Sequence, residues 1–280
     1  FAGFYSVPLY ALTQSRCDAS HRARVIAANN ILNALFMVVS SLMAAGLLHA
    51  GLSLPQLYLV LGLLNAAVAV YIYLLVPEFL MRFIVWMLIH TVYRLDKRGV
   101  EHLPEAGAAL IVCNHVSFVD ALVIAAACPR PIRFVMDHNI FKLPIISFVF
   151  RTGRAIPIAA ARDNPKMTAR AFDEVEKALA DGDLVAIFPE GRITDTGELY
   201  PFKPGVTRIL ERSPVPVIPM ALRGLWGSFF SRKDGQAMSK PWRLRPLRKI
   251  ALEIAAPVSA VGATPQALQD KVAALRGEWR

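Results

Sequence analysis

Hydrophobic residues are concentrated in the first third of the chain, where two long runs carry no charge. Residues 31–54 and 57–76 contain no Lys, Arg, Asp or Glu. About 20 apolar residues cross the hydrocarbon core of a bilayer as an α-helix, so each run predicts a transmembrane helix. The alternative is a buried helical hairpin of a soluble protein, which adjacent charge-free runs of this length disfavour. Residues 1–12 then predict the end of an earlier span, in a chain that continues further upstream.

Cations flank these two runs but are missing from the short link between them. The flanking cations are Arg16, Arg22, Arg24, Arg82, Arg94, Lys97 and Arg98. The link, residues 51–55, carries no charge. Because short loops rich in Lys and Arg stay in the cytoplasm, we expect a multi-pass protein of the cell inner membrane. Everything after residue 94 would then face the cytoplasm.

The next segment, residues 79–95, is apolar but is interrupted by Arg82 and His90. It contains Trp and Tyr, which are typical of the membrane–water interface. We therefore expect a linker helix that either lies in the interface or is partly inserted. The hydrophobic pattern is compatible with both arrangements.

Beyond residue 95, short apolar runs alternate with segments of helical length and spacing. The predicted strands are 108–113, 133–136, 155–158, 184–188, 215–221 and 250–254, and the predicted helices are 118–128, 143–151, 165–180, 205–212 and 264–276. This alternation predicts an α/β fold with a mostly parallel sheet flanked by helices. The chain thus divides into transmembrane helices (1–78), the linker helix (79–95) and an α/β domain (96–280).

Polar residues directly after the first of these strands are the first candidates for chemistry. Ligands of parallel α/β folds collect at the carboxyl ends of strands, where Asn114, His115 and Asp120 are expected. On one continuous helix His115 and Asp120 would point apart, whereas a turn at 116–117 lets the carboxylate reach the imidazole. A carboxylate on one ring nitrogen leaves the other free to take a proton from a hydroxyl. The alternative is that both residues only stabilise the strand end and the helix start.

A second candidate site follows the fourth predicted strand, in the sequence AIFPEGRITDTGELYPFKPG (residues 186–205). Gly191 beside Arg192 lets backbone N–H groups and a guanidinium approach a phosphate together. Glu190 and Lys203 lie in the same segment. The alternative is a surface turn with a solvated ion pair.

Together the two motifs resemble those of the glycerolipid acyltransferase family, which includes the 1-acylglycerol-3-phosphate acyltransferases. The first block of that family, Asn-His-x-x-x-x-Asp, corresponds to residues 114–120. The third block, Phe-Pro-Glu-Gly-Arg, corresponds to residues 188–192, and a Val-Ile-Pro strand corresponds to residues 217–219. The resemblance covers about residues 96–260, in the order of the family.

Two blocks depart from the family pattern. The second block, Gly-x-Ile-Pro-Ile-x-Arg in the family, reads Gly-Arg-Ala-Ile-Pro-Ile at residues 153–158, so that its Arg is displaced. Either Arg154 or Arg162 is expected to replace it. The form Glu-Gly-Arg-Ile-Thr at residues 190–194 resembles the 2-acylglycerophosphoethanolamine acyltransferases.

The front third also carries a resemblance. Residues 3–9, 24–30 and 32–37 resemble the last helices of a lysophospholipid transporter of the major facilitator superfamily. Interhelical hydrogen bonding, rather than a substrate site, is the expected role of three asparagines here: Asn29, Asn30 and Asn33.

The resemblance implies a membrane-bound acyltransferase that moves a fatty acyl group from a thioester to the free hydroxyl of a lysophospholipid in phospholipid remodelling. The implied donor is acyl-CoA or acyl-carrier protein, and no metal or cofactor is implied. His115 is implied as the general base and Asp120 as the residue that holds it. The residues expected to bind the acceptor or stabilise the oxyanion are Asn114, Glu190, Gly191, Arg192, Lys203, Arg162 and Arg154.

Two alternatives stay open: a 1-acylglycerol-3-phosphate acceptor, and a lipid transporter with a non-catalytic lipid-binding rear domain. The formal net charge of +10 and the hydrophobic content of 55% favour membrane lipids as partners. Nucleic acid is disfavoured because the cations are scattered rather than clustered in a stripe. Residues 225–235 and 240–249 interleave Trp or Phe with Lys and Arg, which predicts contact with lipid headgroups. An ordinary basic loop is the alternative for these two segments.

Overall fold

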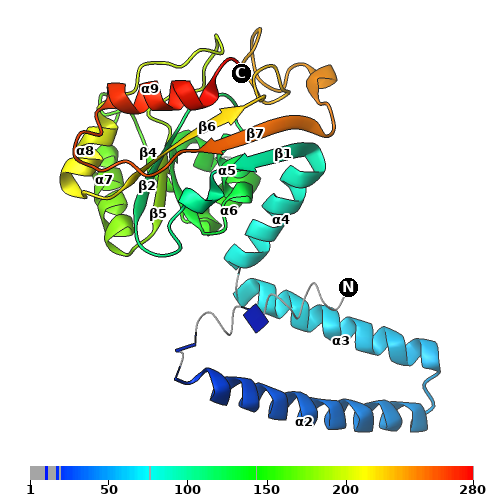
Figure 1. Cartoon of the computed structure of the whole chain (residues 1–280). Helices are drawn as coiled ribbons and strands as arrows, with labels where there is room; N and C mark the ends of the chain where they lie inside the picture. The colour runs from blue at the N-terminus through cyan, green and yellow to red at the C-terminus, as the bar shows by residue number, and fades with distance from the viewer. Residues whose placement is uncertain (1–9, 12–16, 19, 76, 143, 280) are drawn as a thin grey trace. The chain divides into compact units, whose positions relative to one another are not determined.

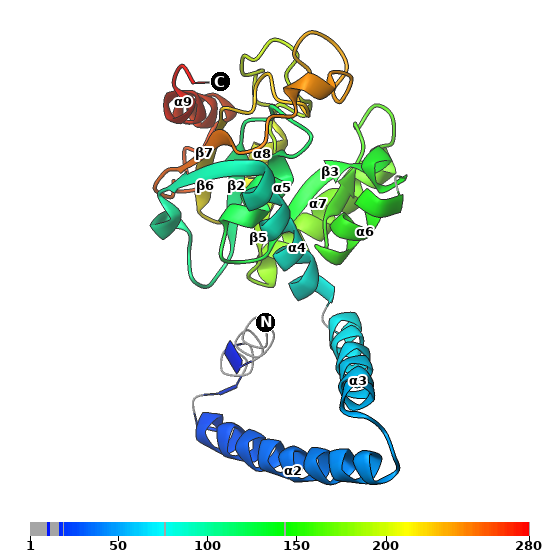
Figure 2. The same ribbon diagram turned by 90° about the vertical axis from the view of Figure 1, so that its right-hand side faces the viewer.

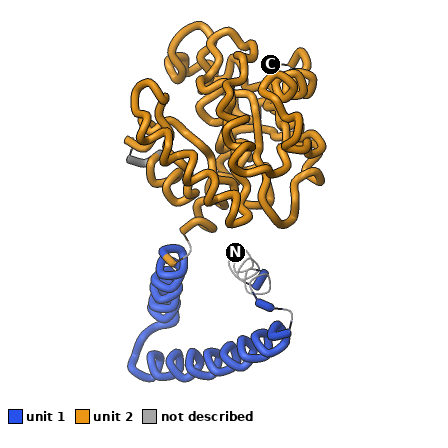
Figure 3. The backbone as a smooth tube through the Cα atoms, turned by 90° about the vertical axis from the view of Figure 1, so that its left-hand side faces the viewer, with its two compact units in different colours: residues 1–74 blue, residues 75–280 orange. Residues whose placement is uncertain are grey.

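The computed structural model divides the chain into two compact units (Figure 3), which comprise residues 1–74 and 75–280. The residues whose structure is described are 10–11, 17–18, 20–75, 77–142 and 144–279. The resemblance of residues 3–9 and the basic residue Arg16 lie outside these described ranges, as does most of the span end expected over residues 1–12.

The first unit contains two long apolar helices, α2 (Arg22–His49) and α3 (Leu54–Leu75) (Figure 1). Both are long and apolar enough to cross a membrane. Helix α2 has no buried residue, so its apolar side chains are available to lipid or to other helices. Asn29 and Asn33 each donate from Nδ2 to the hydroxyl of Tyr10, at 3.1 and 3.0 Å. These contacts fit the interhelical hydrogen bonds expected for the asparagines.

The second unit is built on a seven-stranded sheet in the order β1-β7-β6-β2-β5-β3-β4. All neighbouring strands are parallel except β6 and β7, which confirms the mostly parallel sheet. The strands are β1 (Tyr93–Arg98), β2 (Ala109–Cys113), β3 (Ile132–Asp137), β4 (Ile156–Ile158), β5 (Leu184–Ile187), β6 (Val217–Arg223) and β7 (Arg248–Ile254).

Helices cover both faces of this sheet (Figure 2). Helices α4 (Pro77–Val92), α5 (Asp120–Ala127) and α6 (Pro144–Thr152) share one hydrophobic core, and α7 (Pro165–Ala180), α8 (Gly205–Arg212) and α9 (Pro265–Arg276) share the other. Side chains of a strand point alternately to the two faces. Ile111 of β2 therefore packs in the first core, while Leu110 and Val112 pack in the second.

Most of the expected linker, residues 79–95, forms helix α4. Helix α4 packs on α5, and its Val85 and Ile89 are buried in the first core. The strand β1 that follows was not predicted, because its sequence YRLDKR is mostly charged. Charged side chains are typical of a strand at the edge of a sheet. Residues 79–95 lie within the compact unit that comprises residues 75–280.

Candidate active site

The sequence-predicted site residues follow strands that end at one edge of the sheet. Strands β6, β2, β5, β3 and β4 all run in the same direction, so their carboxyl ends lie along this edge. His115 comes two residues after β2, and Glu190 comes three residues after its neighbour β5. Parallel strand pairing thus brings the two sequence motifs side by side.

His115 and Asp120 meet as a hydrogen-bonded pair. The Nδ1 atom of His115 lies 2.8 Å from Oδ2 of Asp120, which is the first residue of α5 and is fully buried. The same Oδ2 atom accepts hydrogen bonds from the backbone N–H groups of Val116 and Ser117, at 2.6 and 2.9 Å. These bonds hold the turn that folds the carboxylate back to the imidazole. An Nδ1–H that donates to a carboxylate leaves Nε2 as the basic nitrogen.

The segment that follows β5 contacts both the ring and the backbone of His115. Its ring stacks on Phe188, with 4.2 Å between ring centroids and 14° between the planes. Its backbone N–H donates to Oε1 of Glu190 at 2.7 Å, and its carbonyl accepts from the N–H of Thr194 at 2.9 Å. The side chain is still 21% exposed, so a substrate hydroxyl has access to the ring.

The carboxylate of Glu190 is hydrogen-bonded by the backbone of the protein itself. It is 2% exposed, and Oε1 accepts from His115 N while Oε2 accepts from Tyr200 N at 2.8 Å. Burial raises the pKa of Glu190 to about 7, although the two N–H donors act in the opposite direction. These two bonds join His115 to the loop, and binding of the acceptor by Glu190 stays a proposal.

The side chain of Asn114 is also hydrogen-bonded within the fold. Its side chain is completely buried, Nδ2 donates to the carbonyl of Leu222 at 3.0 Å, and Oδ1 accepts from the N–H of Leu222 at 2.7 Å. This pair of bonds continues the β2–β6 ladder by one residue. Both polar atoms of the side chain thus have a partner in β6. A role of Asn114 at the oxyanion stays a proposal.

Two cations gather on the exposed side of this loop. The guanidinium of Arg192 lies over the ring of Tyr200, 3.8 Å from its centroid. Nζ of Lys203 lies against Gly191, which has a left-handed φ of 67° and no side chain to obstruct the amine. Backbone N–H of Lys203 also donates to Pro189 at 2.9 Å. Arg192, Lys203 and the Gly191 backbone therefore lie on the loop that is hydrogen-bonded to His115 through Glu190, and they supply the donors that an anion-binding cluster requires.

The structure separates the two candidates for the displaced arginine. Arg154 precedes β4 and Arg162 follows it, so the two residues lie at opposite edges of the sheet. Only Arg162 lies at the edge of His115, where its side chain is 88% exposed and contacts Asp163 at 3.3 Å. Both arginines stay candidates, and Arg162 is the one that follows β4 on the side of His115.

Sequence reasoning gave no role to Tyr200 and Thr194. The ring of Tyr200 packs against the guanidinium of Arg192. Its backbone N–H donates to Glu190, and its hydroxyl donates to Asp195. Thr194 is buried and bonds the carbonyls of His115 and Glu198. Neither residue has a spacing that marks it in the sequence, because both act through the folded loop.

Cys113 is buried at the end of β2. Desolvation raises the pKa of its thiol well above the ordinary value, so the thiolate nucleophile is suppressed. His115 is therefore the reactive side chain at this strand end rather than Cys113.

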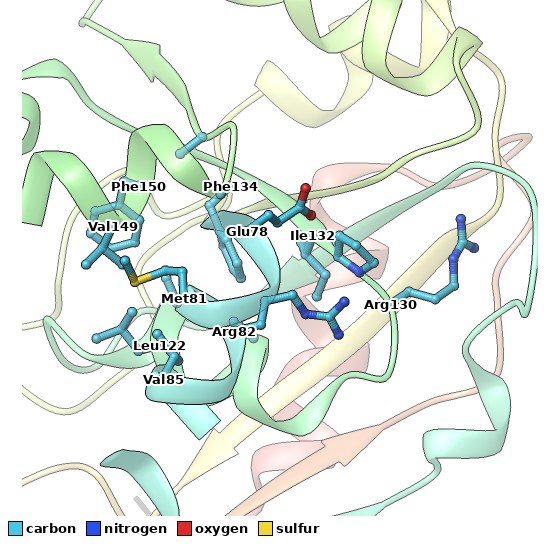
Figure 4. A pocket seen from close by; sticks show the side chains of 15 residues that line it. Glu78, Met81, Arg82, Val85, Leu122, Arg130, Ile132, Phe134, Val149 and Phe150 are labelled. Carbon is cyan, nitrogen blue, oxygen red and sulfur yellow. The ribbon is translucent and has the colours of Figure 1, made fainter. Parts of the chain in front are cut away.

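An apolar pocket lies in the same unit, between α4, α5, β3 and α6 (Figure 4). Its walls include Met81, Leu122, Phe134 and Phe150. Phe134 also stacks on Phe188, with 6.5 Å between centroids, and Phe188 in turn stacks on His115. A continuous row of rings thus joins the pocket wall to the imidazole.

Part of this unit is similar to known acyltransferases. Residues 94–223 match the family model described as Acyltransferase. The matched part of the unit is thus similar to the 1-acylglycerol-3-phosphate acyltransferases. The match begins at residue 94 and does not include helices α2 and α3.

Individual relatives carry the same name. A chloroplastic 1-acyl-sn-glycerol-3-phosphate acyltransferase of Brassica napus is 29% identical over 137 residues, 49% of this chain and 39% of that protein. The human 1-acyl-sn-glycerol-3-phosphate acyltransferase beta is 28% identical over 140 residues, 50% of each chain. The chain thus spans half or less of the length of these two relatives.

A solved structure shares the fold. The crystal structure of the 1-acyl-sn-glycerophosphate acyltransferase PlsC from Thermotoga maritima superposes with a TM-score of 0.52 at 21% identity. The superposition covers 64% of this chain and 69% of that one. It confirms the predicted α/β fold.

Proposed function

We propose that the α/β unit transfers a fatty acyl group from a thioester to the free hydroxyl of a lysophospholipid, with His115 as general base. The observation that carries this proposal is the exposed imidazole whose Nδ1 is bound to buried Asp120, beside the cations Arg192 and Lys203. Homology to 1-acylglycerol-3-phosphate acyltransferases supports the reaction class.

In the proposed reaction, Nε2 of His115 takes the proton of the acceptor hydroxyl as its oxygen attacks the thioester carbonyl. The carbon–oxygen ester bond forms, the carbon–sulfur bond breaks, and the departing thiolate takes the proton back from Nε2. Asp120 stabilises the transient imidazolium through Nδ1–H and keeps the ring in the reactive tautomer. No covalent intermediate on the enzyme is needed.

Arg192 and Lys203 are proposed to bind the phosphate of the acceptor. Arg192 supplies a planar pair of N–H donors, and Tyr200 holds the guanidinium in place from one face. Lys203 supplies a compact charge over Gly191. Both lie on the loop that bonds His115 through Glu190 and Thr194, so the phosphate and the reacting hydroxyl are positioned by one rigid element.

The acyl chain is proposed to enter the apolar pocket of Figure 4. Its lining is predominantly hydrophobic, and the Phe134–Phe188 stack leads from it to His115. Burying a saturated chain there stabilises the complex by about 0.8 kcal/mol for each methylene group.

Two acceptors have an observation in their favour. The sequence form Glu190 to Thr194 and the transporter-like helices favour a 2-acylglycerophosphoethanolamine acceptor, with transport of the lysophospholipid by the complete protein. The names of the relatives favour a 1-acylglycerol-3-phosphate acceptor. The two acceptors differ in the charge of the phosphate, which is a diester in the first and a monoester in the second.

Acyl transfer by the purified full chain in detergent tests the proposal. Labelled acyl-CoA and acyl-carrier protein are offered as donors with a panel of lysophospholipids, and the product is measured as diacyl lipid. We expect His115→Ala to lose about 10²- to 10⁴-fold in kcat, while the matched variant His49→Ala in the first unit keeps full activity. Acylation of no acceptor, or an active His115→Ala protein, would favour the non-catalytic lipid-binding domain instead.

A further inference from the structure

Helix α9 (red in Figure 1) has one face in the core of the unit and another against the loop that follows β5. Leu268 and Val272 are buried in the second core and anchor the helix there. Gln269 and Arg276 are seven residues apart, so they lie on one face of the helix, two turns from each other. Both residues come after residues 94–223, the segment that matches the acyltransferase family.

Gln269 and Arg276 bind the loop at two separate points. Oε1 of Gln269 accepts a hydrogen bond from the backbone N–H of Phe202 at 3.0 Å. Nη1 of Arg276 donates to the carbonyl of Gly197 at 2.9 Å, and Nη2 donates to Oε2 of Glu198 at 3.0 Å. The side chain of Arg276 is only 13% exposed, so the loop replaces water around its guanidinium and these bonds are stronger than those of an exposed ion pair.

The turn at Gly197 is fixed from two further sides. Its φ of 82° is left-handed, and a Cβ atom at this position would lie 2.7 Å from the ring of Trp226. Its N–H donates to Oγ1 of Thr194 at 3.1 Å, and the N–H of Thr194 donates to the carbonyl of His115 at 2.9 Å. The carbonyl that Arg276 holds is therefore linked to the backbone of His115 through Gly197 and Thr194.

The two anchor points flank the residues that carry the cations of the site. Tyr200 lies between Glu198 and Phe202 in the chain, and the guanidinium of Arg192 lies 3.8 Å from the centroid of its ring. Lys203 directly follows Phe202. A loop that is free at either anchor would therefore carry Arg192 and Lys203 over a wider range of positions.

We propose that Arg276 and Gln269 are positioning residues, which fix the loop so that Arg192 and Lys203 meet the phosphate of the acceptor without rearrangement. This role rests on the proposed function, in which these two cations bind that phosphate. A loop that is ordered before binding loses less conformational entropy when the lysophospholipid arrives. Arg276 and Gln269 act through the loop and do not contact the substrate.

Kinetics of the purified full chain test this role, with 1-acylglycerol-3-phosphate and 2-acylglycerophosphoethanolamine as acceptors and acyl-CoA or acyl-carrier protein as donor. Arg276→Gln loses the charged hydrogen bonds to the loop, so we expect the KM for the acceptor to rise about 10-fold. Both kcat and the KM for the donor should change less than about twofold, because His115 keeps its bond to Asp120. Arg276→Lys keeps one charged donor and should recover part of the loss. Arg212→Gln removes another ion pair of the same unit and is the matched control.

Gln269→Leu provides a second variant, because it removes the other anchor without changing a charge. It should raise the KM for the acceptor about fivefold. Gln269→Glu keeps an accepting oxygen for the N–H of Phe202 and should leave this KM near the wild-type value.

A double-mutant cycle separates positioning from a general loss of stability. In the Arg192→Gln/Lys203→Gln background the two cations are already gone, so adding Arg276→Gln should raise the KM for the acceptor less than about twofold. A further rise of about 10-fold in this background, or equal effects on acceptor and donor, would overturn the proposal.

Hydrogen exchange of residues 197–203 tests the same role without acyl transfer. We expect Arg276→Gln and Gln269→Leu to speed this exchange and to weaken its protection by 1-acylglycerol-3-phosphate. Unchanged exchange with equal protection would overturn the proposal, even in an active enzyme. A wild-type chain that acylates no acceptor but shows the expected change in exchange would contradict the proposed acyl transfer alone and support the role of α9.

Discussion

A single carboxylate oxygen of Asp120 accepts three hydrogen bonds. The donors are Nδ1–H of His115 and the backbone N–H groups of Val116 and Ser117. Asp120→Asn keeps the shape and one accepting oxygen but removes the negative charge. We expect kcat to fall about 10²- to 10⁴-fold, because the imidazolium is no longer charge-balanced. Asp173→Asn, at an exposed ion pair with Arg212, is the control and should have wild-type activity. Near-normal kcat in Asp120→Asn, with a folded protein by circular dichroism, would contradict the proposed role.

Glu190 predicts a dependence of stability on pH. Burial raises its pKa to about 7, above the ordinary value of 4.5, so the folded state holds this proton more tightly than the unfolded state. Its contribution to stability is therefore complete below about pH 4.5 and is lost as the pH rises to about 7, a change of about 3 kcal/mol.

Glu190→Gln cannot ionise, so it isolates this contribution. The amide leaves one of the two backbone N–H groups without an acceptor, which costs stability equally at every pH. We expect wild-type Tm to fall relative to the variant between pH 5 and pH 8. A difference in Tm that is equal at both pH values would contradict the raised pKa.

Asn114 and Glu190 show what the sequence could not predict about the site. Strand ends and motif spacing were sufficient to predict that Asn114, His115 and Glu190 lie at one edge of the sheet. They did not predict which side chains face outward. The side chain of Asn114 is hydrogen-bonded to the backbone of Leu222, which is 108 positions away in the chain. A partner so distant has no local sequence signal.

At the scale of elements, local patterns predicted helices α7 and α8 with their observed bounds. Helix α7 has a strong local start signal, because Asn164 accepts from the N–H of Met167 and Pro165 occupies the first turn. Strand β1 has no such signal. It exists because it pairs with β7, from Tyr93 with Arg248 onward, and this pairing is visible only in the fold. The burial of α4 is likewise visible only in the fold. Its amphipathic pattern did not show whether its apolar face contacts lipid or a protein core.

The pocket between α4, α5, β3 and α6 leads to a prediction on chain length. Leu122 lines this pocket and is partly buried, so Leu122→Trp should shorten the space available to an acyl chain. We expect a lower kcat/KM with long-chain donors and little change with short ones, because the short chain does not reach the added ring. Val261→Trp, at a residue 89% exposed, is the matched control. An equal loss with all donors would argue against the pocket as the acyl site.

At the scale of the whole molecule, the charge distribution predicts how the chain crosses the membrane. Helices α2 and α3 are joined at residues 50–53, which carry no charge, whereas Arg22 and Arg24 lie at the start of α2 and Arg82, Arg94 and Lys97 follow α3. Lys and Arg are retained on the cytoplasmic side. The link should therefore face outward and the α/β unit should face the cytoplasm, where acyl thioesters are available.

Single cysteines test this orientation in a background with Cys17→Ser, because Cys113 and Cys128 are buried. Ser53→Cys reports on the exposed link, and Ala169→Cys reports on the exposed surface of α7. A membrane-impermeant maleimide applied to intact cells should label Ser53→Cys, and should label Ala169→Cys only after the membrane is opened. The reverse pattern would place His115 and Asp120 on the outer side, away from acyl-CoA. Acyl transfer would then require a donor other than a cytoplasmic thioester, so the orientation of two helices decides which substrates the site can use.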